Sequence, residues 1–104
     1  MIYSIKAQYI EEKLNKFYQK ITDGTIANQK PDGQEIVASM KRAKITESNT
    51  IQWSEMCFCN PPLKHERATV YDQFLINLET KIMDDHVQFD GESFFDFLDK
   101  QFKK

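Results

Sequence analysis

The sequence has few glycines and cysteines and lacks the short motifs that mark common catalytic sites. Its three glycines each fall in an expected turn, so they cannot build a phosphate-binding loop. The patterns HExxH, GxSxG and paired CxxC do not occur, which excludes the metalloprotease, serine-hydrolase and paired-cysteine zinc sites that they mark. No run of about 18 apolar residues is present, so we expect no transmembrane helix.

The charge balance excludes two classes of partner. The formal net charge is -2, so the chain has no strong positive field to draw it to nucleic acid or to an anionic membrane. The N-terminal stretch MIYSIKAQYIEEK lacks the cationic start and the apolar run of a signal peptide. With only two cysteines, we expect a cytoplasmic protein. A chain of 104 residues is typical of one domain, here residues 1–104.

Hydrophobic periodicity predicts the elements of the first half. Residues 3–9 alternate between apolar and polar side chains, as in a half-buried strand. A helix follows from about Glu11 and ends near Gly24, because glycine suits a left-handed helix cap. After a turn at 31–33, the pattern predicts a second strand over 35–46, with a bulge near 41–42 or with both faces covered. The apolar residues on one face of that strand are Ile36, Ala38 and Met40.

The second half begins with the other strand of a hairpin. After a short loop at 47–49, residues 50–59 form a third strand that carries apolar groups on both faces. Pro61 and Pro62 end this strand, because proline cannot extend a ladder of hydrogen bonds. The remaining expected elements are a helix over 63–83, a short strand over 86–90, and a last helix to Phe102 that is capped by Ser93 with Asp96.

This order of elements, β-α-β-β-α-β with a further C-terminal helix, is that of the ferredoxin-like, split βαβ arrangement. We therefore expect an α+β fold with a four-stranded antiparallel sheet and helices on one face. The apolar groups on both faces of residues 50–59 indicate that the second sheet face is also covered. In element order the chain resembles the dimeric α+β barrel superfamily, in which two sheets stack face to face and enclose a pocket. That resemblance implies a homodimer and a pocket for a small molecule.

The polar run His65-Glu66-Arg67 lies at the expected corner between the third strand and the long helix. Such a run can present a general base, a carboxylate and an anion clamp. Arg67 falls on the apolar stripe of the helix and needs a carboxylate partner, which Glu55 on the strand can supply. A buried pair of this kind would be structural, whereas a cleft holding both groups would be a site.

For the catalytic interpretation, we assign His65 as the proton-transfer group and Glu55 as its carboxylate partner. The candidate substrate-binding residues are Trp53, Cys57, Arg67 and Tyr71. Among these, Arg67 binds an anion, and Trp53 and Tyr71 form pocket walls. The structural interpretation places Trp53 in ordinary core packing.

Cys57 and Cys59 raise the question of a metal or redox site. In a regular strand, residues two apart are about 6.6 Å apart on the same face, which is too far for a disulfide. Zinc would need two further ligands, and His65 is the only nearby candidate. We therefore favour two small buried hydrophobic groups and expect neither a metal nor another cofactor.

The sequence predicts a homodimer that binds or transforms a small apolar or aromatic molecule by cofactor-independent acid–base chemistry. The alternative is a non-enzymatic interaction or regulatory module that uses the open sheet face and the C-terminal helix as its interface. A pocket that reaches Glu55 or His65 would favour the first hypothesis.

Overall fold

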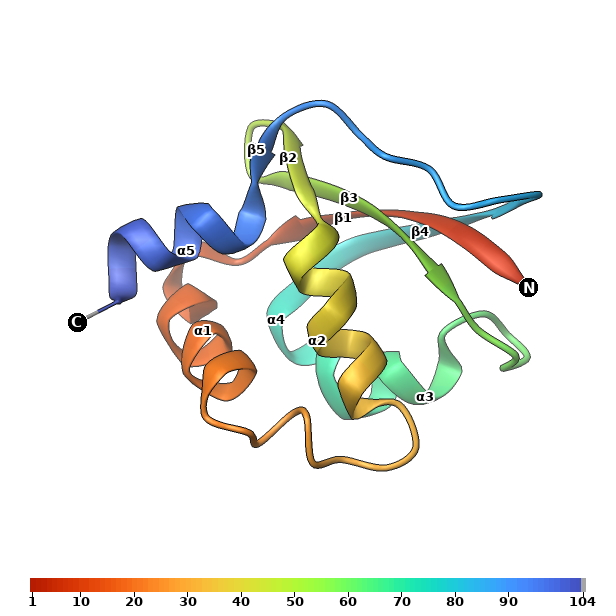
Figure 1. Cartoon of the computed structure of the whole chain (residues 1–104), viewed down its shortest axis with the longest axis horizontal. Coiled ribbons are helices and arrows are strands. Elements are labelled where there is room, and N and C mark those ends of the chain that lie inside the picture. Colours follow the sequence, from red (N-terminus) through yellow and green to blue (C-terminus); the bar gives the residue numbers. More distant parts are fainter. Residues whose placement is uncertain (104) are drawn as a thin grey trace.

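The computed structural model describes residues 1–103 and contains one antiparallel sheet with the strand order β4-β1-β3-β2-β5 (Figure 1). Its strands are β1 (Ile2–Tyr9), β2 (Lys44–Glu47), β3 (Thr50–Met56), β4 (Leu75–Met83) and β5 (Glu92–Ser93). The α+β class and the antiparallel sheet are confirmed, but the sheet has five strands rather than the expected four.

The helices lie on one side of the sheet, below the strands in Figure 1. The first, α1 (Leu14–Thr22), follows a 3-10 turn (Glu11–Lys13). The others are α2 (Gly33–Arg42); a composite helix of α3 (Lys64–Glu66), a π-helical turn (Arg67–Tyr71) and α4 (Asp72–Phe74); and α5 (Phe94–Phe102). Within residues 1–103, no helix has the length and apolar character needed to cross a bilayer.

The core fills the space between the helices and the inner face of the sheet. Alternate residues of β1 and β3 point into it, and Ile5 lies opposite Trp53 with both side chains buried. The rings of Phe17 on α1 and Phe74 on α4 stack at 4.5 Å between centroids. Most of the residues that alternate with the inward-facing ones on β1 and β3 are polar, among them Ser4, Lys6 and Gln52. The alternation of apolar and polar side chains predicted for residues 3–9 is therefore present in strand β1.

The predicted strand over 35–46 is wrong, because most of it is helix α2. Ile36 and Met40 are four residues apart and both fully buried, which is the spacing of one helical face. The same residues are also an even number apart, so they fit one face of a strand equally well. Gly33 starts the helix where only glycine fits, since a Cβ there would lie 2.0 Å from the Ile26 carbonyl oxygen. Only the last residues of the predicted strand form β2.

The predicted helix over 63–83 is correct only in its first half. The composite helix ends at Phe74, and the remaining residues form strand β4 along the outer edge of β1. That edge of β1 has N–H and C=O groups that need partners, and β4 supplies them. Leu75, Leu78 and Ile82 have helical spacing, yet the long-range pairing with β1 decides their conformation.

The chain after β4 follows β3 without forming the predicted strand over 86–90. Ser54 on β3 holds this segment: its Oγ lies 2.8 Å from His86 Nδ1 and accepts a bond of 3.2 Å from the Val87 N–H. Ser54 is buried as a result, so part of the cover expected over the third strand comes from the chain itself. The cap of the last helix is confirmed, because the Asp96 N–H donates to Ser93 Oγ at 3.2 Å.

Candidate functional site

The corner between β3 and α3 brings together side chains from three separate parts of the chain. Strand β3 ends at Met56 rather than at the predicted residue 59, and the chain then turns before α3. The Cys57 N–H donates to the Met1 carbonyl at 2.8 Å, which fixes the end of the strand. Leu63 is fully buried in a left-handed conformation (φ 60°) and directs the chain into α3. Glu66 on α3 consequently faces the two cysteines.

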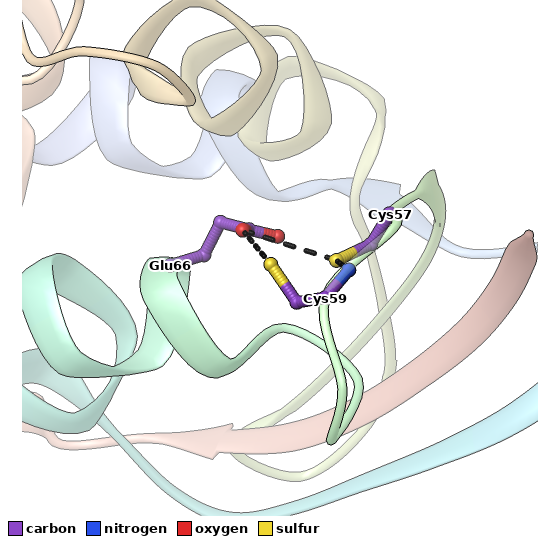
Figure 2. A group of neighbouring side chains, drawn as sticks. All are labelled: Cys57, Cys59 and Glu66. Atoms are coloured by element: carbon purple, nitrogen blue, oxygen red, sulfur yellow. Dashed lines mark hydrogen bonds between the residues drawn. The ribbon is translucent and has the colours of Figure 1, made fainter.

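The two thiols and the Glu66 carboxyl group form a compact cluster (Figure 2). Glu66 Oε1 lies 4.0 Å from Cys57 Sγ and 3.7 Å from Cys59 Sγ. The Cys59 N–H donates to Cys57 Sγ at 3.2 Å, a contact that the turn makes possible. Both cysteines are free thiols. Cys57 is buried, as the sequence predicts for a small hydrophobic group, and burial raises the pKa of its thiol to about 11.

Glu55 lies behind this cluster and is fully buried. Its Oε1 accepts hydrogen bonds from Trp53 Nε1 at 2.9 Å and from the Tyr71 hydroxyl at 2.8 Å. Burial is the main cause that raises the pKa of Glu55 to about 8, and the neighbouring Glu66 carboxyl raises it further. Its Oε2 is also buried and has no hydrogen-bond partner within residues 1–103.

Asp32, in the turn before α2, reaches the same corner from the opposite side. Its Oδ2 lies 2.6 Å from His65 Nδ1, at the start of α3. One ligand atom from each of Asp32, His65 and Glu66 lies within 4.8 Å of the others. Burial raises the pKa of Glu66, and the Asp32 carboxyl beside it acts in the same direction. The neighbouring carboxyl groups of Asp32 and Glu66 therefore connect His65, which contacts Asp32, with the two cysteines, which contact Glu66.

The predicted pairing of Glu55 is wrong in both of its forms. His65 bonds to Asp32 rather than to Glu55. Arg67 Nε donates to Asp72 Oδ1 at 3.0 Å near the surface, so the expected buried Glu55–Arg67 pair does not form. Trp53 and Tyr71 are the real partners of Glu55.

A cleft of about 330 Å³ opens over the cluster. Its described lining residues are Pro31, Asp32, Glu35, Met56, Cys57, Phe58, Cys59 and Glu66. Cys57 is thus the one candidate substrate-binding residue that lines it. Trp53 and Tyr71 lie in the core, with their ring centroids 5.4 Å apart. Neither Glu55 nor His65 is among the described lining residues, so the cleft does not meet the condition that would favour the first hypothesis.

Sequence reasoning missed Asp32, which lies against His65, and did not include Glu66, which faces the two cysteines, among the candidate site residues. The signal for Glu66 was its place in the polar run beside His65. The connection that holds the 31–33 turn is long enough for a function, but its residues also suit an ordinary turn, so the sequence did not single out Asp32.

The fold and the site define an α+β protein with one antiparallel sheet and a cleft lined by thiols and carboxyl groups. Comparison of the chain with protein-family models, with curated proteins and with solved structures gave no match.

Proposed function

We propose that the protein binds a small molecule in the cleft over the β3–α3 corner and transfers a proton to or from it. His65 is the proton-transfer group, and Asp32 takes the carboxylate role first assigned to Glu55. The observation that carries this proposal is the 2.6 Å contact between His65 Nδ1 and Asp32 Oδ2. Asp32 lines the cleft, whereas His65 is not among the described lining residues; its side chain is 41% exposed beside Asp32. A carboxylate bonded to one ring nitrogen fixes the imidazole and leaves Nε2 to exchange a proton.

The lining of the cleft supports a ligand that is partly apolar. Met56 and Phe58 are apolar members of the lining, and Asp32 and Glu66 are acidic members. Phe58 is 84% exposed, so its ring is available to a flat or apolar group. The acidic groups disfavour an anionic ligand, which agrees with the position of Arg67 outside the cleft lining.

The test is proton exchange between solvent and a small molecule. The protein is incubated in D₂O with a pool of small carbonyl compounds, and mass spectrometry measures deuterium taken up at carbon. We expect uptake into at least one compound, and a loss of more than about tenfold in rate with His65→Gln or Asp32→Asn. Glu79→Gln, which changes an exposed glutamate of β4 outside the cleft lining, should retain the activity. Equal uptake with His65→Gln would overturn the assignment of this residue.

A second proposal is that the protein is a homodimer whose interface lies beside the cleft. Mostly apolar residues surround a hollow of about 480 Å³ at one end of the sheet: Met1, Ile2, Met56, Phe58, Ile82 and Met83, together with Asp84. Met56 and Phe58 belong to both hollows, so a second copy on this surface would also enclose the cleft. The phenylalanines of α5 support the interface alternative less well, because Phe94 is buried and Phe95 packs on Tyr18 of the same chain.

We also propose that the fold is a ferredoxin-like domain extended by β5. The order β4-β1-β3-β2 supports this, because β3 lies between β1 and β2 while β1 lies between β3 and β4. Two interleaved split βαβ units have this arrangement.

For the compartment, we propose the cytoplasm. Two free thiols 3.7 Å and 4.0 Å from one carboxylate oxygen suit a reducing environment, in which they stay unoxidised.

A further inference from the structure

We propose that Cys57, Cys59 and Glu66 bind a zinc ion whose remaining coordination position opens into the cleft. This site uses the thiol side of the corner, opposite His65, and it stands or falls independently of the proton transfer proposed above. It also goes against the sequence expectation of no metal, which assumed that His65 was the only further ligand nearby.

The distances between the three groups fit the ligands of one tetrahedral ion. Zinc binds sulfur at about 2.3 Å and carboxylate oxygen at about 2.1 Å, so a sulfur and an oxygen on one ion lie about 3.6 Å apart. Glu66 Oε1 lies 3.7 Å from Cys59 Sγ and 4.0 Å from Cys57 Sγ, while the three ligand atoms all lie within 4.8 Å of one another. These separations need only a small contraction to surround a zinc ion.

The corner holds several groups that become anionic, but the described structure places no positive side chain among them. Glu55 is 0% exposed, Glu66 2% and Cys57 5%. Within residues 1–103, no Lys or Arg forms an ion pair with Glu55 or Glu66. Burying such groups without a counter-ion is costly. When Cys57, Cys59 and Glu66 bind an ion as thiolates and carboxylate, a divalent cation supplies their counter-charge.

The unsatisfied Glu55 oxygen is an independent observation at the same place. Oε2 of Glu55 is buried without a partner within residues 1–103, and the Glu55 carboxyl lies against that of Glu66. Glu55 thus lies on the core side of Glu66, where a hydrogen bond between the two carboxyl groups can orient Glu66 as a ligand. Carboxylate ligands in metal sites are commonly held by such outer hydrogen bonds.

The chemistry of the ligands selects the ion. Two sulfurs and one carboxylate favour zinc over magnesium or calcium, which prefer oxygen ligands alone. On binding, the two thiols each release a proton to solvent and form bonds to the zinc ion as thiolates. The Cys59 N–H already donates to Cys57 Sγ at 3.2 Å and would stabilise the thiolate charge. With three protein ligands, the fourth position is left for water or for a bound molecule.

The test uses cobalt(II) as a spectroscopic substitute for zinc on the full chain, purified without a tag and treated with a chelator. We expect about one ion per chain, a thiolate-to-cobalt charge-transfer band in the near ultraviolet, and displacement of cobalt by zinc. Cys59→Ser should remove most of the band, and Glu66→Gln should weaken binding by more than about tenfold. Because Cys59 is only half-buried, its serine variant should fold, which circular dichroism checks.

His86→Ala is the matched control, since this histidine lies at Ser54 away from the cluster and should leave binding unchanged. His65→Gln should also keep the charge-transfer band while it slows deuterium exchange, so failure of either proposal can be recognised separately. The absence of a charge-transfer band would overturn the zinc site. Full binding with Cys59→Ser, but not with Asp32→Asn, would overturn it in favour of an ion held by Asp32, His65 and Glu66.

Discussion

At the scale of single residues, Glu55 has the most restrictive surroundings in the site. Its carboxyl group accepts from Trp53 and Tyr71 on one oxygen and lies against the carboxyl group of Glu66. Burial raises its pKa from an ordinary 4.5 to about 8. In the absence of a metal, Glu55 therefore keeps its proton at neutral pH and can donate a hydrogen bond as well as accept.

This shift predicts how stability depends on pH in chelator-treated protein. Between pH 4.5 and about 8, the unfolded chain loses the Glu55 proton while the folded chain keeps it. The unfolded state then binds fewer protons, so the free energy of unfolding falls as pH rises, by at most about 1.4 kcal/mol per pH unit. Urea unfolding at a series of pH values measures this slope. Glu55→Gln should flatten it and exposed Glu79→Gln should not; an equal slope with Glu55→Gln would refute the assignment.

Tyr71 contributes one of the two donors to the buried Glu55 carboxyl. Tyr71→Phe keeps the ring packing against Trp53 but leaves Glu55 Oε1 with one donor fewer, so we expect a loss of about 1–3 kcal/mol in unfolding free energy. Tyr3→Phe, on a half-buried tyrosine of β1, is the control and should cost less. Chemical denaturation of both variants checks this, and equal losses would argue against the hydrogen bond.

At the scale of elements, the start of α2 determines where Asp32 lies. Gly33 packs directly against the preceding loop, and a Cβ on it would lie 2.0 Å from the Ile26 carbonyl oxygen and 3.0 Å from that of Ala27. The backbone cannot give way at this point without moving Asp32. The position of α2 and the Asp32–His65 contact therefore depend on the same glycine.

We predict that Gly33→Ala destabilises the protein by about 2 kcal/mol or more, because its methyl group clashes with backbone atoms. Gly24→Ala is the comparison: its φ of +92° is unfavourable for alanine, but an added Cβ would meet only the side-chain Nδ2 of Asn28, at 3.4 Å. That variant should cost about 1 kcal/mol. Thermal unfolding compares the two, and a cost for Gly33→Ala no larger than for Gly24→Ala would contradict the close approach.

At the scale of the whole molecule, the cleft and the apolar end of the sheet are adjacent. Met56 is 46% exposed and Phe58 84% exposed, and both residues border each hollow. The proposed dimer interface and the proposed ligand site therefore form one continuous surface.

For the homodimer, we predict that Phe58→Ser weakens self-association by more than about tenfold, because a large exposed aromatic group is a typical interface anchor. Ile76→Ser is the matched control. Ile76 is also exposed (48%), but it lies near the start of β4, whereas the hollow is lined by the other end of this strand. Analytical ultracentrifugation over a range of concentrations measures both. A wild-type monomer at every concentration, or equal effects of the two changes, would contradict the proposed interface.

The sequence by itself determined the elements whose signals are local. The alternation in β1, the helical face of Leu14 and Phe17, and the Ser93 cap each depend on residues a few positions apart, and each is present in the structure. The antiparallel α+β class followed from these signals. The polar run at His65 also pointed to the corner that holds the candidate cleft, because charged side chains beside a strand end are visible without knowledge of their partners.

Only the tertiary structure decided the conformations and partners that depend on distant residues. Residues 35–42 and 75–83 have spacings that suit both a helix and a strand, and their packing or pairing partners lie elsewhere in the chain. Asp32 and His65 are 33 residues apart in sequence, so no local pattern announces their contact. The cysteines face Glu66 only because β3 ends at Met56 and the chain turns. Local sequence sets which conformations are favourable, and long-range burial and hydrogen bonding choose among them.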